Sequence, residues 1–293
     1  MASTVMAPEA ARPGRQARTT ARFASFPAAL PGIGVLAVFG VVPLVVLLVT
    51  ALGLGATGAG EDAGFTLEHL TQVLTSSQLR GEVVNSILVG LGSVLIMLVI
   101  AVPLTLRMSR DGGGSGAVAV VFTLPIALPG IVVGFFTILM LGRTGIFAQA
   151  VPALGGSAYA LPGIFMAYIY FSFPRVIGPL QASVSTFDHS LVDTARTLGA
   201  SRLRAFFTVS LPIILPAVVQ VLGTAAAVTI GGYGTIATLA QHERLLPLSV
   251  ADQLSNGYRV ASASGLAVVL ALIAAGTLAL SRAASTWLSR RQR

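Results

Sequence analysis

The residues with the most specific spacing lie in one polar segment of an otherwise apolar chain. Asp193-Thr194-Ala195 is followed by Gly199 and then, after nine residues, by Val209-Ser210-Leu211-Pro212. These residues predict a short helix that carries one carboxylate and an apolar face and that a glycine ends. The segment brings no nucleophile and base together.

No catalytic or metal-binding pattern accompanies this segment. The chain contains no cysteine, and its three histidines, His69, His189 and His242, fall between the apolar stretches. An enzyme that works inside a membrane needs a nucleophile and a base, or metal ligands, that converge at depth. We therefore predict no catalytic residue, no metal site and no cofactor bound by this chain.

The composition is that of a protein that crosses a membrane many times. Its mean hydropathy is +0.87, and only 10% of its residues are charged, against about a quarter in a soluble domain. The charges leave six apolar intervals, which are 23–60, 83–106, 112–142, 144–174, 205–241 and 260–281. Each interval holds the roughly 20 residues that a helix needs to cross the hydrocarbon core. The predicted fold class is an all-α membrane protein with six transmembrane helices.

The arginines predict that both termini lie in the cytoplasm. All 18 basic residues are arginines, and an N-terminus inside places 14 of them on the cytoplasmic side and 4 outside. Basic residues in short flanking segments are retained on the cytoplasmic side. The net charge of +8 is then explained by helix ends that face anionic headgroups, and we expect no nucleic-acid partner.

The polar segment 176–210 predicts a helical hairpin. Asp188 is suited to cap a first helix. The apolar face of this helix consists of Leu191, Ala195 and Leu198. Gly199 is suited to end it, because the left-handed residue after a helix is most often glycine. Ser201 is suited to cap a second helix that leads into the next span.

This spacing resembles the EAA loop in permease subunits of type I ABC importers. Those permeases carry Glu-Ala-Ala, three residues, Gly, nine residues and Ile-x-Leu-Pro, and every interval is the same here. Asp193, Thr194 and Val209 stand where the family has Glu, Ala and Ile. Ala200, directly after Gly199, also looks family-like. The resemblance covers the chain from 84 to 280.

The resemblance implies a MetI-like fold and a mechanical role for the loop. In the family the short helix is a coupling helix, which docks on a nucleotide-binding subunit and transmits ATP-driven movement to the spans. The implied coupling residues are Asp193, Thr194, Ala195, Leu198, Gly199, Ala200, Leu211 and Pro212. ATP and magnesium are then expected on a separate ATPase subunit, and this chain is expected to be a transport subunit, not an enzyme. The other implied partners are an external solute-binding protein and a second permease, in a homodimer or a heterodimer.

Proline and glycine predict where a translocation pathway runs. Pro125 and Pro129-Gly130 interrupt the third span, and irregular backbone at membrane depth is tolerated only beside protein or a water-filled cavity. Packing alone would also explain such a kink. Gly231-Gly232-Tyr233-Gly234, at the end of the fifth span, is similar to a segment in permeases for sulfate, molybdate, iron, thiamine, polyamines and phosphonates. The resemblance favours a small charged solute of this range over a sugar or a peptide.

We expect four segments in a multi-pass protein of the bacterial inner membrane. They are a disordered basic cytoplasmic tail at 1–25, the first span and an external loop at 26–83, a permease core at 84–284 with five spans and the coupling loop 176–210, and a basic tail at 285–293. The alternative is a secondary transporter or a channel subunit. Ion coupling needs ionisable groups inside the spans, and the six intervals contain none.

The arginine distribution predicts the outcome of a topology experiment. Reporter fusions after Gly112 and Ser185 should report a cytoplasmic location, whereas fusions near Glu61, Gly155 and Gln253 should report an external one. An external location after Ser185 would contradict the coupling-loop assignment, because the loop would then face away from any ATPase.

Overall fold

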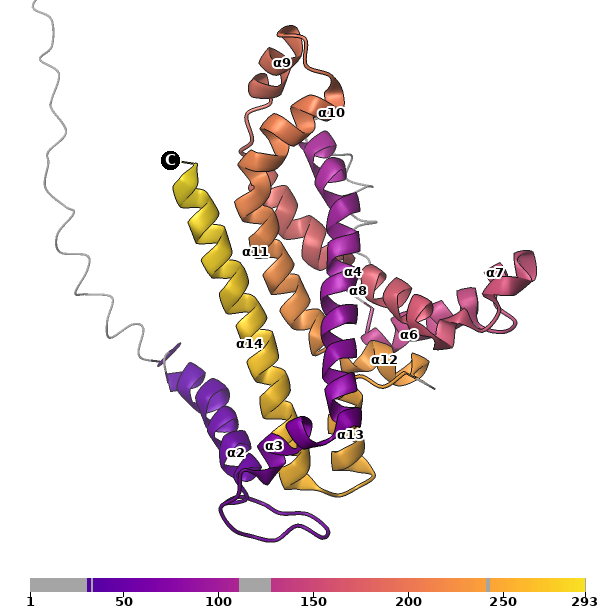
Figure 1. The fold of residues 1–293 in the computed structure, drawn as a ribbon, viewed down its shortest axis with the longest axis vertical. Helices are drawn as coiled ribbons and strands as arrows, with labels where there is room; N and C mark the ends of the chain where they lie inside the picture. The colour runs from indigo at the N-terminus through magenta and orange to yellow at the C-terminus, as the bar shows by residue number, and fades with distance from the viewer. Residues whose placement is uncertain (1–30, 33, 111–127, 241–242, 293) are drawn as a thin grey trace, which may run out of the picture. The chain divides into compact units, whose positions relative to one another are not determined.

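The computed structural model describes residues 31–32, 34–110, 128–240 and 243–292, and its regular elements there are all helical. The elements are η1 (Ala37–Val41), α2 (Val42–Ala51), α3 (Glu68–Thr75), α4 (Ser77–Arg110), α6 (Gly130–Leu141), α7 (Ile146–Ala150), η3 (Pro152–Leu154), η4 (Ser157–Tyr159), α8 (Leu161–Val184), α9 (Ser190–Thr197), α10 (Arg202–Ala205), η5 (Phe206–Ser210), α11 (Leu211–Ile230), α12 (Tyr233–Leu239), α13 (Leu246–Ser255) and α14 (Val260–Arg291). Figure 1 shows them along the chain. The predicted tail 1–25 lies outside the described residues.

Six helical stretches among the described residues are long and apolar enough to cross a membrane, which confirms the predicted number of spans. They are Gly34–Ala51, Ser77–Arg110, Gly130–Ala150, Leu161–Val184, Arg202–Ile230 and Val260–Arg291. The chain from Leu47 to Arg293 forms one compact unit, and the bundle described below belongs to it. The predicted segment boundaries at 83/84 and 284/285 lie inside α4 and α14.

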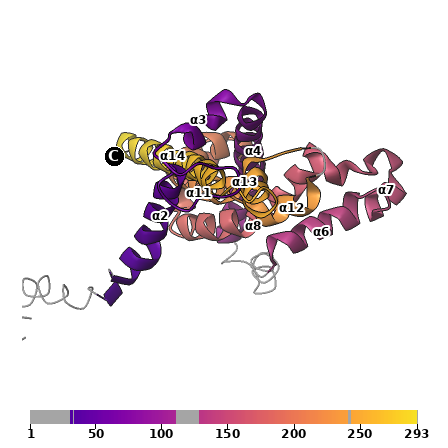
Figure 2. The same ribbon diagram turned by 90° about the horizontal axis from the view of Figure 1, so that it is seen from below.

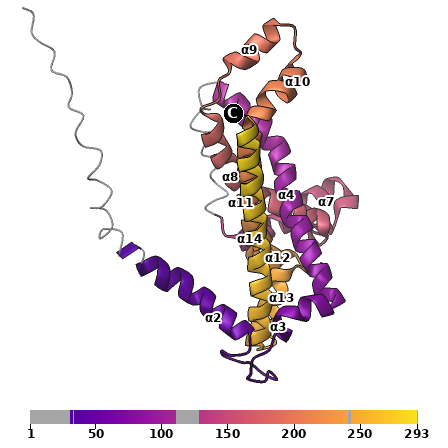
Figure 3. The same ribbon diagram turned by 60° about the vertical axis from the view of Figure 1, so that its left-hand side comes forward.

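Helices α4, α8, α11 and α14 form the centre of this unit. Helix α11 packs against the other three. Figure 1 shows it between α14 and α4, and Figure 3 shows α14 in front of it with α4 alongside. The buried residues at its contacts with α4 and α8 are mostly small or aliphatic, among them Val94, Val176 and Ala225. An ideal Cβ at Gly223 would lie only 1.6 Å from the Ser281 hydroxyl, so glycine permits this close approach of α11 to α14.

Helices α6, α7 and α12 lie to one side of that centre, as the view from below shows (Figure 2). Helix α6 packs on α12 and α8. At the other side, α3 packs on α4 and α14. The Ser86 hydroxyl accepts a hydrogen bond from the Leu246 backbone N–H at 2.9 Å, which fixes the start of α13 against α4.

The fourth span is longer than predicted. Helix α8 continues through Pro174 and Pro179 to Val184, so the predicted loop 176–210 begins inside this helix. Each proline removes one backbone donor, but the surrounding residues Val176, Ile177 and Leu180 are fully buried against α4 and α11. Tertiary packing therefore holds the helix across both prolines.

Two ionisable side chains that flank the apolar intervals, Glu82 and Arg175, belong to the long helices α4 and α8, so these helices extend beyond the intervals, which themselves contain no such group. Helix α4 begins before Glu82, whose side chain is buried at 2% exposure and accepts a hydrogen bond from Gln78 Nε2 at 2.9 Å. Arg175 lies inside α8, where its guanidinium stacks 3.8 Å from the Phe171 ring centroid and donates to the Phe171 carbonyl. Apolar intervals mark where charges are absent, but they do not mark where a helix begins or ends.

A carboxylate from the loop before α3 caps the last span. Glu61 accepts hydrogen bonds from the backbone N–H groups of Ala261 and Ser262, in the first turn of α14, at 2.9 and 2.8 Å. It also accepts from the Gly58 N–H at 2.8 Å. Burial raises the pKa of Glu61, but the three backbone hydrogen bonds outweigh burial and lower the pKa from 4.5 to about 2. The ionised carboxylate thus fastens this loop to a helix 200 residues further along the chain.

Replacing Glu61 by Gln should lower the melting temperature of the purified protein at pH 7, because an amide is a weaker acceptor at a helix N-terminus. The cost should be about 1 kcal/mol, in the range of measured helix caps. Since the folded pKa is depressed, the contribution of Glu61 is present above pH 4.5 and is lost as the pH falls toward 2. The difference between the two proteins should therefore shrink from pH 5 to pH 3. The neighbouring Asp62→Asn variant is the control, and an equal loss there would contradict the capping role.

Candidate functional site

The hairpin formed by α9 and α10 projects beyond the ends of α8 and α11 (Figure 1). Gly199 ends α9 with a φ of +88°, which is the left-handed conformation predicted for it. Its N–H donates to the Arg196 carbonyl at 3.0 Å, and the Ala200 N–H donates to the Ala195 carbonyl at 3.0 Å. This pair of bonds is a Schellman motif, which satisfies carbonyls that the end of the helix leaves free.

Side chains accept hydrogen bonds from backbone N–H groups at the start of both helices of the hairpin, but the N-cap of α9 is His189 and not the predicted Asp188. The Asp188 carboxylate accepts from the Ser190 N–H at 2.9 Å, and hydrogen bonds from the Ser190 hydroxyl and N–H lower the pKa of Asp188. The Ser201 hydroxyl accepts from the Arg204 N–H at 3.3 Å, as predicted. The second helix does not stop before the span, since α10, η5 and α11 follow one another without a break.

Two polar contacts join the end of α4 to the start of the hairpin. Arg110 pairs with Asp193 at 2.8 Å, and the Ser109 hydroxyl lies 2.9 Å from His189 Nε2. The Arg110 and Asp193 side chains are 48% and 50% exposed, so water screens their attraction and the pair is worth at most about 1 kcal/mol. Sequence reasoning missed this pairing, because the two residues lie 83 positions apart and nothing local links them.

The hairpin exposes apolar side chains that the rest of the described chain does not cover. Leu198 is 83% exposed, Leu203 is 73% exposed and Phe207 is 60% exposed. Of the other predicted coupling residues in α9, Ala195 is partly buried, and the Thr194 hydroxyl donates to the Ser190 carbonyl within the helix. An exposed apolar patch of this kind is suited to contact with another protein.

The last two predicted coupling residues join the hairpin to the bundle. Leu211 packs against the core between α4, α8 and α11. The Pro212 carbonyl accepts a hydrogen bond from the side-chain amide of Gln292, just after α14. This carbonyl has no helical partner because Pro216, four residues later, has no N–H. The end of α14 thereby supplies the hydrogen bond that the proline removes.

The predicted pathway residues come together at a second place, where α6 meets α12. Pro129 directly precedes α6, which begins at Gly130. An ideal Cβ at Gly130 would lie 3.0 Å from the Thr235 backbone nitrogen, and one at Gly234 would lie 3.3 Å from that of Ile131. Backbones from two distant parts of the sequence are therefore in close contact here. The prediction for Pro125 lies outside the described residues.

The glycine stretch after the fifth span is short. Helix α11 ends at Ile230, Gly231 and Gly232 connect the helices, and Tyr233 and Gly234 already belong to α12. The Tyr168 hydroxyl of α8 donates to the Gly232 carbonyl, which satisfies part of this irregular backbone.

Two residues at this place were missed by the predicted site. Tyr168 was not a candidate, because nothing in the sequence connects α8 with the glycine stretch. The Thr235 hydroxyl is buried and has no hydrogen-bond partner among the described residues. The one indication of Thr235 in the sequence was its position directly after the predicted pathway residue Gly234.

Comparisons with known proteins agree with this arrangement of helices. Residues 99–293 match the family described as binding-protein-dependent transport system inner membrane component. A molybdate/tungstate transport system permease of Pyrococcus abyssi is 30% identical over 68% of this chain and 75% of its own. A molybdenum transport system permease of Haemophilus influenzae is 27% identical over 70% of this chain and 91% of its own. A chain in the crystal structure of a bacterial alginate ABC transporter bound to its periplasmic protein has a TM-score of 0.69 and 16% identity, and the match covers 88% of this chain and 92% of that one. At this identity the last comparison shows a shared fold alone.

Proposed function

The chain belongs to the family of binding-protein-dependent transport system inner membrane components, and from this membership we propose which solute it moves and how it is driven. It is a permease subunit of an ABC importer, a multi-pass protein of the inner membrane. The proposed cargo is molybdate or tungstate. We propose that an external binding protein delivers it and that a separate ATPase, which binds ATP and magnesium, drives its passage through a pair of permease chains.

The α9–α10 hairpin is the proposed docking site for the ATPase. The observation that carries this proposal is the exposed set of Leu198, Leu203 and Phe207 beside the Schellman motif at Gly199. These side chains gain free energy only when a partner covers them. The hairpin continues directly into α11, so a force applied to it acts on a helix of the central bundle.

The chemistry around the α6–α12 contact suits a tetrahedral oxyanion. The buried polar side chains here and on the adjoining parts of α8 and α11 are hydroxyls, namely Thr137, Tyr168, Ser172, Thr229 and Thr235. Thr137, Tyr168 and Thr229 already donate to backbone carbonyls. The Thr235 hydroxyl, which has no partner among the described residues, is the donor available to an anion, and it would not hold the anion as a fixed positive charge would in a low dielectric. The relatives named as molybdate or molybdenum permeases supply the identity of the anion.

Replacing Gly199 by Val should uncouple transport from ATP hydrolysis while the spans remain intact. No heavy atom lies within 4 Å of an ideal Cβ at Gly199, so the cost comes from its left-handed backbone and is about 1 to 2 kcal/mol. The hairpin should change its geometry locally. In the purified complex we expect weaker ATPase assembly or loss of substrate-stimulated hydrolysis, with normal amounts of the chain in the membrane.

Gly178→Val is the matched control for this experiment. Gly178 also has no heavy atom within 4 Å of an ideal Cβ, but it lies inside α8 with an ordinary helical backbone. It should assemble and hydrolyse ATP as the unaltered complex does. If Gly199→Val disappeared from the membrane instead, the residue would be needed for folding and the proposed coupling role would be wrong.

Deleting the gene should abolish high-affinity uptake of radiolabelled molybdate, and the intact gene should restore it. Tungstate should compete with molybdate for this uptake, because the two anions have the same charge and tetrahedral shape. A gene that carries Gly199→Val should not restore molybdate uptake. Binding of both anions by the partner binding protein provides an independent measurement. Loss of uptake of a neutral disaccharide, with molybdate uptake unchanged, would overturn the proposed cargo.

A further inference from the structure

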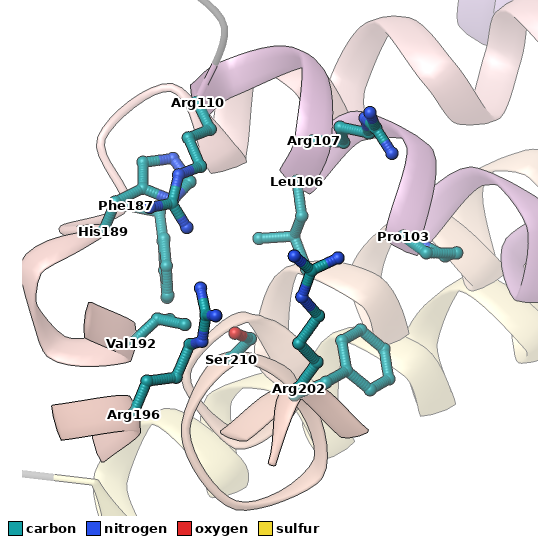
Figure 4. Close-up of a pocket in the computed structure, with 11 residues that line it drawn as sticks. Pro103, Leu106, Arg107, Arg110, Phe187, His189, Val192, Arg196, Arg202 and Ser210 are labelled. Atoms are coloured by element: carbon teal, nitrogen blue, oxygen red, sulfur yellow. The ribbon is translucent and has the colours of Figure 1, made fainter. Parts of the chain in front are cut away.

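A pocket of about 450 Å³ lies between the end of α4 and the α9–α10 hairpin, and arginines dominate its polar lining. Arg107 and Arg110 come from α4, Arg196 from α9 and Arg202 from α10. Figure 4 shows the guanidinium groups of Arg110, Arg196 and Arg202 directed toward the space between these elements, with the Ser210 hydroxyl at its floor. The pocket thus gathers donors from separate parts of the chain into one place.

The positive charge in this pocket is poorly compensated by the protein. Arg110 pairs with Asp193 at 2.8 Å. Among the described residues, no carboxylate lies within salt-bridge distance of Arg107, Arg196 or Arg202. The second ion pair there joins Arg244 to Asp252, away from the pocket. Like charges that share a site repel one another. An anion bound in the pocket would offset the repulsion between these arginines. It would thereby hold together α4, α9 and α10, which carry them.

We propose that this pocket is an oxyanion site that binds one phosphate-like group and holds the hairpin to the end of α4. Arg196 and Arg202 are its principal ligands, because a guanidinium offers paired donors that match the oxygens of a tetrahedral anion. The Ser210 hydroxyl supplies a further donor. Arg110 keeps its pairing with Asp193 and adds positive charge at the edge.

Two sources can supply this chemistry: the phosphate of an anionic lipid headgroup and a free inorganic oxyanion. The pocket is also lined by Pro103, Leu106 and Phe206, which could contact an acyl chain. The site lies at the hairpin, whereas the proposed pathway residues lie at the contact of α6 with α12. It is therefore separate from the pathway and does not depend on which solute the permease carries.

The test uses the purified full-length chain. Isothermal titration in neutral detergent measures binding of inorganic phosphate and of molybdate. Native mass spectrometry measures retention of phosphatidylglycerol, after reconstitution in phosphatidylcholine with or without this lipid. We expect saturable binding of one anion per chain in at least one arm. Arg196→Gln and Arg202→Gln should each weaken it by about ten-fold or more, the loss typical of one hydrogen bond to a charged group.

Arg204→Gln is the matched control, since it removes the same charge from α10 but does not line the pocket. It should leave the affinity unchanged. Binding of phosphate or molybdate identifies a free anion as the ligand, and selective retention of phosphatidylglycerol identifies a lipid. The proposal is overturned if neither binds, or if Arg204→Gln weakens binding as much as Arg202→Gln, which would show diffuse surface charge. It is also overturned if binding vanishes when the ATPase assembles, because a partner side chain would then fill the pocket.

Discussion

A backbone N–H or C=O that enters lipid finds no water, so the protein must pair it, and an unpaired group costs several kcal/mol. Helices satisfy this requirement along most of the chain. Pro216 removes the donor that the Pro212 carbonyl would otherwise have, and the Gln292 side chain supplies one instead. Where the backbone leaves the helix at Gly232, the Tyr168 hydroxyl donates a hydrogen bond to the Gly232 carbonyl. The irregular stretch between α11 and α12 is therefore possible only because α8 packs beside it.

The same requirement explains why the hairpin can be small and still hold its shape. The Schellman bonds at Gly199 and the cap at Ser201 satisfy the helix ends within a turn of a few residues. From Arg202 the chain then runs as one helical stretch of 29 residues to Ile230, which is about 43 Å long. Under the proposed function, a displacement of the hairpin reaches the α6–α12 region through this helical stretch. No non-helical residue interrupts it, although the π-helical turn η5 and Pro216 lie within it.

Local patterns were readable from the sequence, and contacts between distant segments were not. The left-handed Gly199 and the cap at Ser201 depend on residues within one or two turns, and the sequence predicted both correctly. The ion pair of Arg110 with Asp193 and the capping of α14 by Glu61 depend on where helices meet in space, and no spacing rule contains that information. The apolar interval that ends at 174 underestimated the fourth span for a related reason, because burial of α8 holds the helix past Arg175 and Pro179 to Val184.

The free energies of the ion pair at Asp193 and of apolar burial indicate which part of the hairpin would contribute most to binding an ATPase. Asp193 is half exposed and already paired within the chain, so moving it to a new partner exchanges one screened ion pair for another, a gain of at most about 1 kcal/mol. Covering Leu198, Leu203 and Phe207 would each contribute about 1.5 to 3 kcal/mol for full burial. Apolar contact would therefore dominate affinity, while Asp193 would orient the hairpin through α4. The shorter carboxylate at this position is compatible with docking for the same reason, since its contact lies within its own chain.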